Sequence, residues 1–228
     1  MAALARVSHY HALQTTIRER SLTATVVAVS KRQSPEAIAA LYAAGCRNFG
    51  ENYVQEWQQK RLALADTCPE IAWHFIGRLQ RNKLADLVGR VALIHSLASL
   101  DHLKKIHALA EKTAITQTLL VQVNIGQEAS KAGIAPDILQ HFLQEAATYP
   151  RARIAGLMTF PAPTPHPETL RPVFAALRAL RDRANAEHWY PIAPLTELSM
   201  GTSGDWKIAL EEGATLLRLG TVVFGGEK

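Results

Sequence analysis

A lysine that directly follows a short apolar segment is the first candidate for chemistry in this sequence. Lys31 comes after residues 25–30 (TVVAVS), a run typical of a strand that is buried on both faces. At the end of such a strand a lysine is partly desolvated, which lowers the pKa of its amine. A neutral amine can form a Schiff base with an aldehyde. A lysine that turns outward into solvent is the common alternative at this position.

Two segments rich in small residues near the C-terminus could bind an anion. Residues 199–204 (SMGTSG) precede a predicted helix, and Gly220 and Thr221 follow the last predicted strand. Small residues let backbone N–H groups approach an anion, and a helix N-terminus favours negative charge. Each segment alone is compatible with ordinary turn and cap chemistry. Together with Lys31 they favour a phosphorylated aldehyde cofactor, and pyridoxal 5′-phosphate (PLP) meets these requirements. The candidates from these segments are Ser199, Met200, Ser203, Gly220 and Thr221.

Arg218 and His74 are further candidates beside such a cofactor. Arg218 lies two residues before Gly220, so its guanidinium could face the pyridine nitrogen of the ring. Because arginine only donates hydrogen bonds, it would keep that nitrogen unprotonated and weaken the ring as an electron sink. The alternative for Arg218 is a salt bridge across the rim, for example with Glu51. His74 could pack on the cofactor or be a core histidine with satisfied hydrogen bonds.

These residues fall at the ends of a series of short β-like segments that alternate with helical or connecting segments. Such alternation predicts a single α/β domain over residues 1–228, a (β/α)₈ TIM barrel. A doubly wound open sheet is disfavoured because no G-x-G-x-x-G motif follows the first strand. In the barrel, the C-terminal ends of all strands meet at one rim, which would bring the candidates together. The predicted strands are residues 25–30, 47–49, 72–76, 93–97, 119–124, 154–158, 197–199 and 216–219.

Composition narrows the class of protein. The chain has 228 residues, 48% hydrophobic and 20% charged, which excludes disordered and collagen-like classes. No apolar run of about 18 residues or secretory signal is present, and Cys46 and Cys68 are too few for a disulfide framework or a metal site. We therefore expect a cytoplasmic protein without metal. A pI of about 9.4 is the one feature that suggests nucleic-acid binding, and the scattered Lys and Arg residues argue against it.

Several segments, in order, resemble a known family. They are VAVSK (27–31), CRNFGENYVQE (46–56), WHFIGRLQRNK (73–83), VNIGQEASKAGI (123–134), GLM (156–158), LSMGTSGDW (198–206) and RLGTVVFG (218–225). Together they resemble the pyridoxal phosphate homeostasis proteins, relatives of the N-terminal barrel of bacterial alanine racemase. The resemblance spans nearly the whole chain. It implies a fold-type III barrel without the C-terminal β-domain, which holds PLP on a lysine and takes part in intracellular vitamin B6 homeostasis without established turnover.

The resemblance also implies residue roles. Lys31 corresponds to the Schiff-base lysine and Asn52 to a residue close to the ring. Ser199 and Ser203 would lie near the phosphate together with Gly220 and Thr221, and Arg218 by the pyridine nitrogen. Lys131 corresponds to a secondary lysine involved in cofactor transfer. The sequence departs from the family pattern at Thr202, Gly204 and Ala98.

A PLP-dependent amino-acid racemase built on the same barrel is the enzyme alternative. Racemisation by two bases needs an acid/base group on each face of the substrate. In the alanine racemases that this barrel resembles, a tyrosine from an additional β-domain of a partner subunit serves the second face. Here the chain ends at Lys228, and Tyr53 is the one plausible substitute among five tyrosines. We expect a monomeric carrier or regulator of PLP, with apo PLP-dependent enzymes as its partners.

Overall fold

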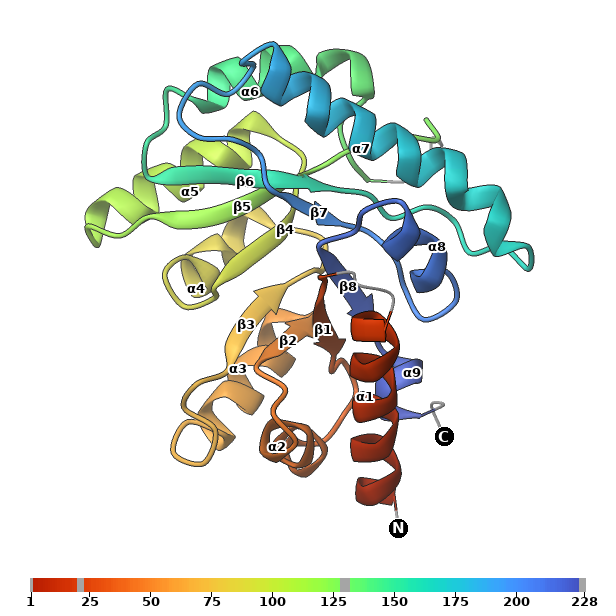
Figure 1. Cartoon of the computed structure of the whole chain (residues 1–228). Coiled ribbons are helices and arrows are strands. Elements are labelled where there is room, and N and C mark those ends of the chain that lie inside the picture. Colours follow the sequence, from red (N-terminus) through yellow and green to blue (C-terminus); the bar gives the residue numbers. More distant parts are fainter. Residues whose placement is uncertain (1, 20–22, 128–131, 226–228) are drawn as a thin grey trace.

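Eight parallel strands of the chain close into a barrel in the computed structural model, which describes residues 2–19, 23–127 and 132–225 (Figure 1). Each strand pairs with the next along the chain, and β8 pairs with β1. This confirms the predicted (β/α)₈ barrel. The strands are β1 (Thr25–Val29), β2 (Asn48–Glu51), β3 (Ala72–Phe75), β4 (Leu93–Leu97), β5 (Gln117–Gln122), β6 (Ala152–Met158), β7 (Glu197–Ser199) and β8 (Leu216–Leu219).

Some strand boundaries differ from the apolar runs in the sequence. β2 extends through Gly50 to Glu51, because backbone pairing with β1 and β3 continues there although neither residue is apolar. β5 begins at Gln117, which pairs with Ala152 of β6, two residues before the predicted start of each strand. Strand pairing depends on backbone groups, so it includes polar residues that a hydrophobic pattern leaves out.

Helices and 3₁₀ turns surround the barrel in the usual alternation (Figure 1). The first helix packs along the last described one, so segments near the two ends of the chain lie side by side. The helices are α1 (Ala2–Glu19), α2 (Pro35–Ala43), α3 (Val54–Ala63), α4 (Leu84–Leu87), α5 (Leu100–Lys112), α6 (Leu139–Ala146), α7 (Arg171–Ala186), α8 (Trp206–Glu211) and α9 (Thr221–Phe224). The 3₁₀ turns are η1 (Arg81–Lys83), η2 (Pro136–Ile138) and η3 (Pro167–Leu170).

Strand side chains alternate between the helical layer and the barrel interior, as the two-residue period of a strand requires. On β2, Phe49 faces outward and packs on Trp73, with ring centroids 6.1 Å apart. Its neighbour Asn48 faces inward and contacts His74. The main apolar core therefore lies between strands and helices. A smaller apolar cluster fills part of the interior and consists of Val27, Leu93, Leu120, Ala155, Met158 and Leu216.

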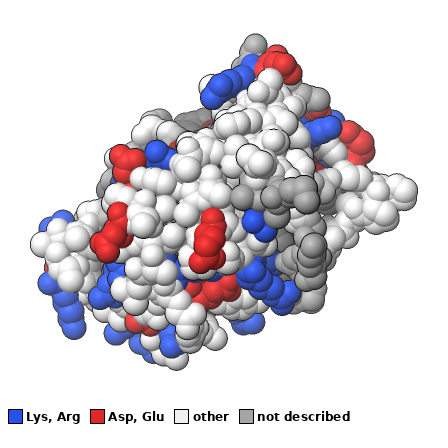
Figure 2. All heavy atoms as spheres, turned by 90° about the horizontal axis from the view of Figure 1, so that it is seen from below, with Lys and Arg blue, Asp and Glu red and all other residues white. Residues whose placement is uncertain are grey.

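The surface mixes charges of both signs. On the face shown in Figure 2, Lys and Arg side chains are interspersed with Asp and Glu among uncharged residues. In the described part of the chain, no helix has the length and apolarity needed to span a membrane.

Gly156 provides a test of the close approach between β6 and β7. A Cβ at this position would lie 2.0 Å from the carbonyl oxygen of Glu197, a backbone atom that cannot move aside at small cost. We expect Gly156→Ala to lower the free energy of unfolding by about 1–3 kcal/mol, measured by urea denaturation. Gly204→Ala is the matched control, since its Cβ would have no heavy atom within 4 Å. Equal stability of the two variants would contradict this packing.

Candidate functional site

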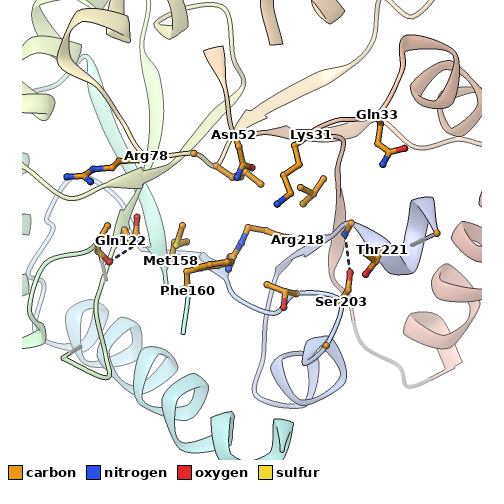
Figure 3. Close-up of a pocket in the computed structure, with 18 residues that line it drawn as sticks. Lys31, Gln33, Asn52, Arg78, Gln122, Met158, Phe160, Ser203, Arg218 and Thr221 are labelled. Carbon is orange, nitrogen blue, oxygen red and sulfur yellow. Dashed lines mark hydrogen bonds between the residues drawn. The ribbon is translucent and has the colours of Figure 1, made fainter. Parts of the chain in front are cut away.

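A cavity of about 410 Å³ opens at the C-terminal ends of the strands. Figure 3 shows Lys31 and Asn52 on one side of it, with Arg218, Ser203 and Thr221 on the other. The described residues around the cavity include three cationic side chains and no carboxylate. An anionic ligand therefore suits this cavity. The sequence-predicted residues that line it are Lys31, Asn52, Ser203, Arg218, Gly220 and Thr221.

The backbone on both sides of Lys31 is held by an ion pair on α3. Lys60 Nζ donates to the carbonyl of Ser30 at 2.5 Å and to Glu56 Oε1 at 2.6 Å. The same carboxylate accepts a hydrogen bond from the backbone N–H of Arg32. Arg32 has a φ of 59°, in the left-handed region that few non-glycine residues adopt. These contacts hold the sharp turn directly after Lys31 in place and thereby fix the position of the Lys31 Cα atom.

Glu51 is fully buried behind this turn and belongs to the same cluster. Its Oε1 accepts from Lys60 at 2.8 Å and from the Ser30 hydroxyl at 2.6 Å. Burial raises the pKa of Glu51, and the hydrogen bond from Lys60 opposes that rise. Lys60 is thus a paired, buried cation and Lys31 is the lysine of the cavity. The salt bridge between Glu51 and Arg218, considered from the sequence, is absent from this described cluster.

Arg218 is buried beside the cavity and held by neutral groups. It donates to Ser199 Oγ at 2.6 Å and to the carbonyl of Thr159 at 2.8 Å. The guanidinium carbon also lies 5.6 Å from the centre of the Phe160 ring. Burial lowers the pKa of Arg218 to about 10, against the opposing charge of Asp205, so the side chain stays cationic at neutral pH.

The loops after β7 and β8 form a concave set of donors. The backbone N–H groups of Gly220 and Val222 converge on Ser203 Oγ, at 3.2 and 3.3 Å. Because that oxygen accepts two hydrogen bonds, its own proton remains to be donated. Thr202 and Gly204 line the cavity beside it, so two of the three departures from the family pattern lie in this loop. Convergent N–H groups with hydroxyl donors are typical of anion sites.

Asn52 has a buried side-chain oxygen, Oδ1, without a hydrogen-bond partner among the described residues. The residue lines the cavity, and Figure 3 shows its side chain on the same side as Lys31. The end of β3 passes close by, since a Cβ on Gly77 would lie 1.9 Å from the Asn52 carbonyl. A buried polar atom without a partner is costly, so a ligand with a matching polar group suits this side of the cavity.

The structure does not bring all predicted site residues to the cavity. His74 and Ser199 lie in the barrel interior and bond to other interior side chains. Met200 is fully buried in the main apolar core. Lys131 lies outside the described residues. Among the alternatives for His74, the geometry favours the buried core histidine.

The cavity also includes residues that sequence reasoning missed. Arg78 lies three residues after the end of β3, Gln122 ends β5, and Met158 and Phe160 come from the end of β6 and its loop. Their position at or shortly after the predicted strand ends is the feature of the sequence from which they could have been predicted. Gln122 donates to the carbonyl of Ala132 at 2.9 Å, which holds the β5 loop against the cavity. The described residues contain no group of three or more His, Cys, Asp or Glu side chains that could hold a metal.

Comparisons with known proteins bear on this site. Residues 8–228 match the family described as alanine racemase, N-terminal domain. A protein of Aquifex aeolicus named pyridoxal phosphate homeostasis protein is 43% identical over 205 residues, which cover 90% of this chain and 88% of that protein. A protein of the same name from Pseudomonas aeruginosa is 38% identical over 206 residues, covering 89% and 84%.

Solved structures show the same relation. PipY of Synechococcus elongatus PCC7942, solved with PLP bound, is 32% identical with a TM-score of 0.87, covering 96% of this chain and 100% of PipY. Alanine racemase from Bartonella henselae, solved with covalently bound pyridoxal phosphate, is 16% identical with a TM-score of 0.70. The match covers 99% of this chain and 61% of the racemase. At that identity the likeness concerns the fold.

The buried histidines make stability depend on pH. Burial lowers the pKa of His74 to about 4 from 6.5, so below pH 6.5 the unfolded chain binds a proton that the folded chain does not. Stability is therefore full above pH 6.5 and falls as the pH drops toward 4. Between pH 6.5 and pH 5 we expect a loss of about 2 kcal/mol from His74, measured by urea denaturation at each pH. A His74→Gln variant should lose less over this range, and an equal loss would contradict the assignment.

Proposed function

This chain belongs to the family of pyridoxal phosphate homeostasis proteins, and we propose that it binds PLP in the cavity and acts as a carrier or regulator in intracellular PLP homeostasis. One observation carries the proposal. Lys31 and Arg218 face one another across a cationic cavity, which also contains the convergent donors around Ser203. A relative with 32% identity was solved with PLP bound.

The residues present fit PLP in three respects. The lining of the cavity has three cations and no described carboxylate, a charge that favours binding of an anion with a dianionic phosphate. The donors at Ser203 and Gly220 suit the phosphate, and the buried Oδ1 of Asn52 suits a polar substituent on the ring. When bound, PLP supplies an aldehyde and an electron-withdrawing ring.

Each residue would then have a separate task. Lys31 would supply the amine that condenses with the aldehyde, forming a C=N bond and releasing the carbonyl oxygen as water. Ser203, Gly220 and Thr221 would bind the phosphate by hydrogen bonds, and Asn52 would contact the ring. Arg218 would donate to the ring nitrogen and, being protonated, would keep that nitrogen without a proton.

We infer that the chain binds PLP without turning over amino acids. Among the described residues that line the cavity, Lys31 provides the one amine, and no tyrosine or histidine is present. Tyr53, the substitute considered from the sequence, is 52% exposed and does not line the cavity. A ring nitrogen that accepts from Arg218 also stabilises a carbanion weakly. The runner-up function, a PLP-dependent racemase, would need a second base on the opposite face.

The location, oligomeric state and partners of the protein are also part of the proposed function. We propose that residues 1–228 act as one PLP-binding domain in the cytoplasm, as a monomer that supplies PLP to apo PLP-dependent enzymes. Lys131, outside the described residues, would act as a secondary lysine in that transfer. The name of the homologous protein from Aquifex aeolicus and the PLP-bound structure of PipY support PLP as the ligand.

The covalent bond to Lys31 is directly testable. Borohydride reduction of the PLP-loaded protein should leave a pyridoxyl adduct on Lys31, identified by peptide mass spectrometry. Lys31→Ala should lose the adduct and the visible absorption band but keep the fold, because the side chain lies at the rim. Lys104→Ala, which changes a half-exposed lysine of α5, is the matched control and should retain both. An unchanged spectrum in Lys31→Ala would overturn the assignment.

Absence of turnover can be tested separately. We expect the PLP-loaded protein, incubated with L-alanine and other amino acids in deuterium oxide, to show no enzymatic rate of α-proton exchange or racemisation by NMR and chiral chromatography. The physical reason is the missing second base on the opposite face. Rapid exchange with loss of optical purity, absent in Lys31→Ala, would instead establish the racemase.

A further inference from the structure

A chain of hydrogen-bonded side chains crosses the barrel interior below the cavity. It begins at Arg218, which donates to Ser199 Oγ at 2.6 Å. Ser199 Oγ lies 2.8 Å from Nδ1 of His95, and Nε2 of His95 lies 2.8 Å from Nδ1 of His74. The chain ends where Nε2 of His74 meets Asn48 Oδ1 at 3.0 Å. We call these five residues, which come from five different strands, the interior polar chain.

The directions of the hydrogen bonds in this chain follow from its two ends taken together, because Asn48 Oδ1 at the far end can only accept. Arginine can only donate, so Ser199 Oγ accepts from it. The Ser199 hydroxyl proton then goes to His95 Nδ1, the remaining contact recorded for that oxygen among the described residues. His95 must therefore carry its proton on Nε2 and donate it to His74, which in turn donates from Nε2 to Asn48. One arrangement satisfies all members at once.

Both imidazoles are neutral in this arrangement. His74 is 5% exposed and His95 is fully buried. Burial lowers the pKa of each, and the nearby Arg218 charge lowers that of His95 further. A second proton on His95, at Nδ1, would remove the acceptor of the Ser199 hydroxyl, whose proton has no other acceptor recorded among the described residues. A neutral pair is what the geometry requires.

Neutral acceptors have a consequence for the arginine charge. Most buried guanidinium groups pair with a carboxylate, which cancels their charge. Here Ser199 Oγ and the Thr159 carbonyl take that place, and the buried carboxylate of Glu51 at the end of β2 is paired with Lys60 instead. The arginine is thus oriented while its positive charge stays available to the cavity. That combination suits a group that must present N–H donors to a neutral ring nitrogen.

We propose that His95 is a positioning residue for Arg218, acting through Ser199, with His74 and Asn48 fixing its tautomer. The ligand part rests on the proposed function, because it assigns the ring nitrogen of PLP as the group that Arg218 meets. A merely structural core cluster would stabilise the barrel without affecting how the ring is held.

The first measurement concerns the chain itself and uses the protein without cofactor. Long-range ¹H–¹⁵N NMR of the labelled protein reports which imidazole nitrogen carries the proton. We expect His95 and His74 both to be neutral and protonated on Nε2 between pH 6 and pH 8. A proton on Nδ1 of His95 would overturn the chain as assigned, whatever the protein binds.

The second measurement compares two substitutions at one position. In His95→Asn the amide oxygen falls near the place of Nδ1 and can still accept from Ser199. In His95→Gln the longer side chain places its amide near Nε2, so that acceptor is lost. We expect the Kd for PLP to rise about tenfold in His95→Gln, the effect of roughly one hydrogen bond. In His95→Asn the Kd should stay within about threefold of the parent value.

Ser199→Ala provides an independent variant if His95→Gln fails to fold. It should weaken PLP by about the same factor, and the double variant should be no weaker than either single one, because both act on one path. The visible band of lysine-bound PLP should stay constant between pH 5 and pH 8 in the parent. The band should become pH-dependent in His95→Gln and in Ser199→Ala, because the ring nitrogen can then be protonated.

The outcomes separate this inference from the proposed function. No borohydride adduct in the unsubstituted protein would overturn the proposed function. Adducts in all variants, with parental affinity and a pH-independent band in His95→Gln and Ser199→Ala, would overturn the role of His95 alone. Loss of PLP affinity in His95→Gln, together with an affinity close to that of the parent in His95→Asn, supports the positioning role of His95.

Discussion

Burial of the Arg218 guanidinium is the constraint around which the interior of this barrel is arranged. A desolvated cation must have hydrogen-bond acceptors, and removal of one partner of a buried charge is costly. The chain supplies Ser199 Oγ and the Thr159 carbonyl, and the hydroxyl needs an acceptor of its own in His95. The requirement passes from one side chain to the next until it reaches Asn48. The interior polar chain is thus explained by the need to satisfy one buried charged residue beside the cavity.

The same barrel separates two lysines by their surroundings. Lys60 is buried among carboxylates and holds the backbone around Lys31, so its amine is committed to hydrogen bonds. Lys31 points into a cavity whose described lining has no carboxylate. A lysine pairs with a carboxylate to become a structural cation, whereas one without such a partner can react as an amine. Under the proposed function, the pairing of Lys60 with Glu51 and Glu56 leaves Lys31 as the reactive amine.

Much of the fold could be predicted because hydrophobic runs, caps and the alternation of strands with helices are local properties. The eight strands were found on this basis, and Lys31, Ser203, Gly220 and Thr221 followed as residues at their C-terminal ends. Errors occurred where backbone pairing extends beyond an apolar run, as at the C-terminal end of β2 and the starts of β5 and β6. The assignment of PLP depended on the combined motifs of a family, since each residue alone had an ordinary alternative.

By itself, the sequence determined the barrel and the set of polar residues at its strand ends, because both depend on patterns a few residues long. Only the tertiary structure decided which way those residues face. Ser199 and His95 are 104 residues apart and meet across the barrel, while Met200, one residue further, packs in the outer core. Strand register controls this choice, since adjacent side chains point to opposite faces of the sheet. Register is set by pairing between distant strands, so no local pattern contains it.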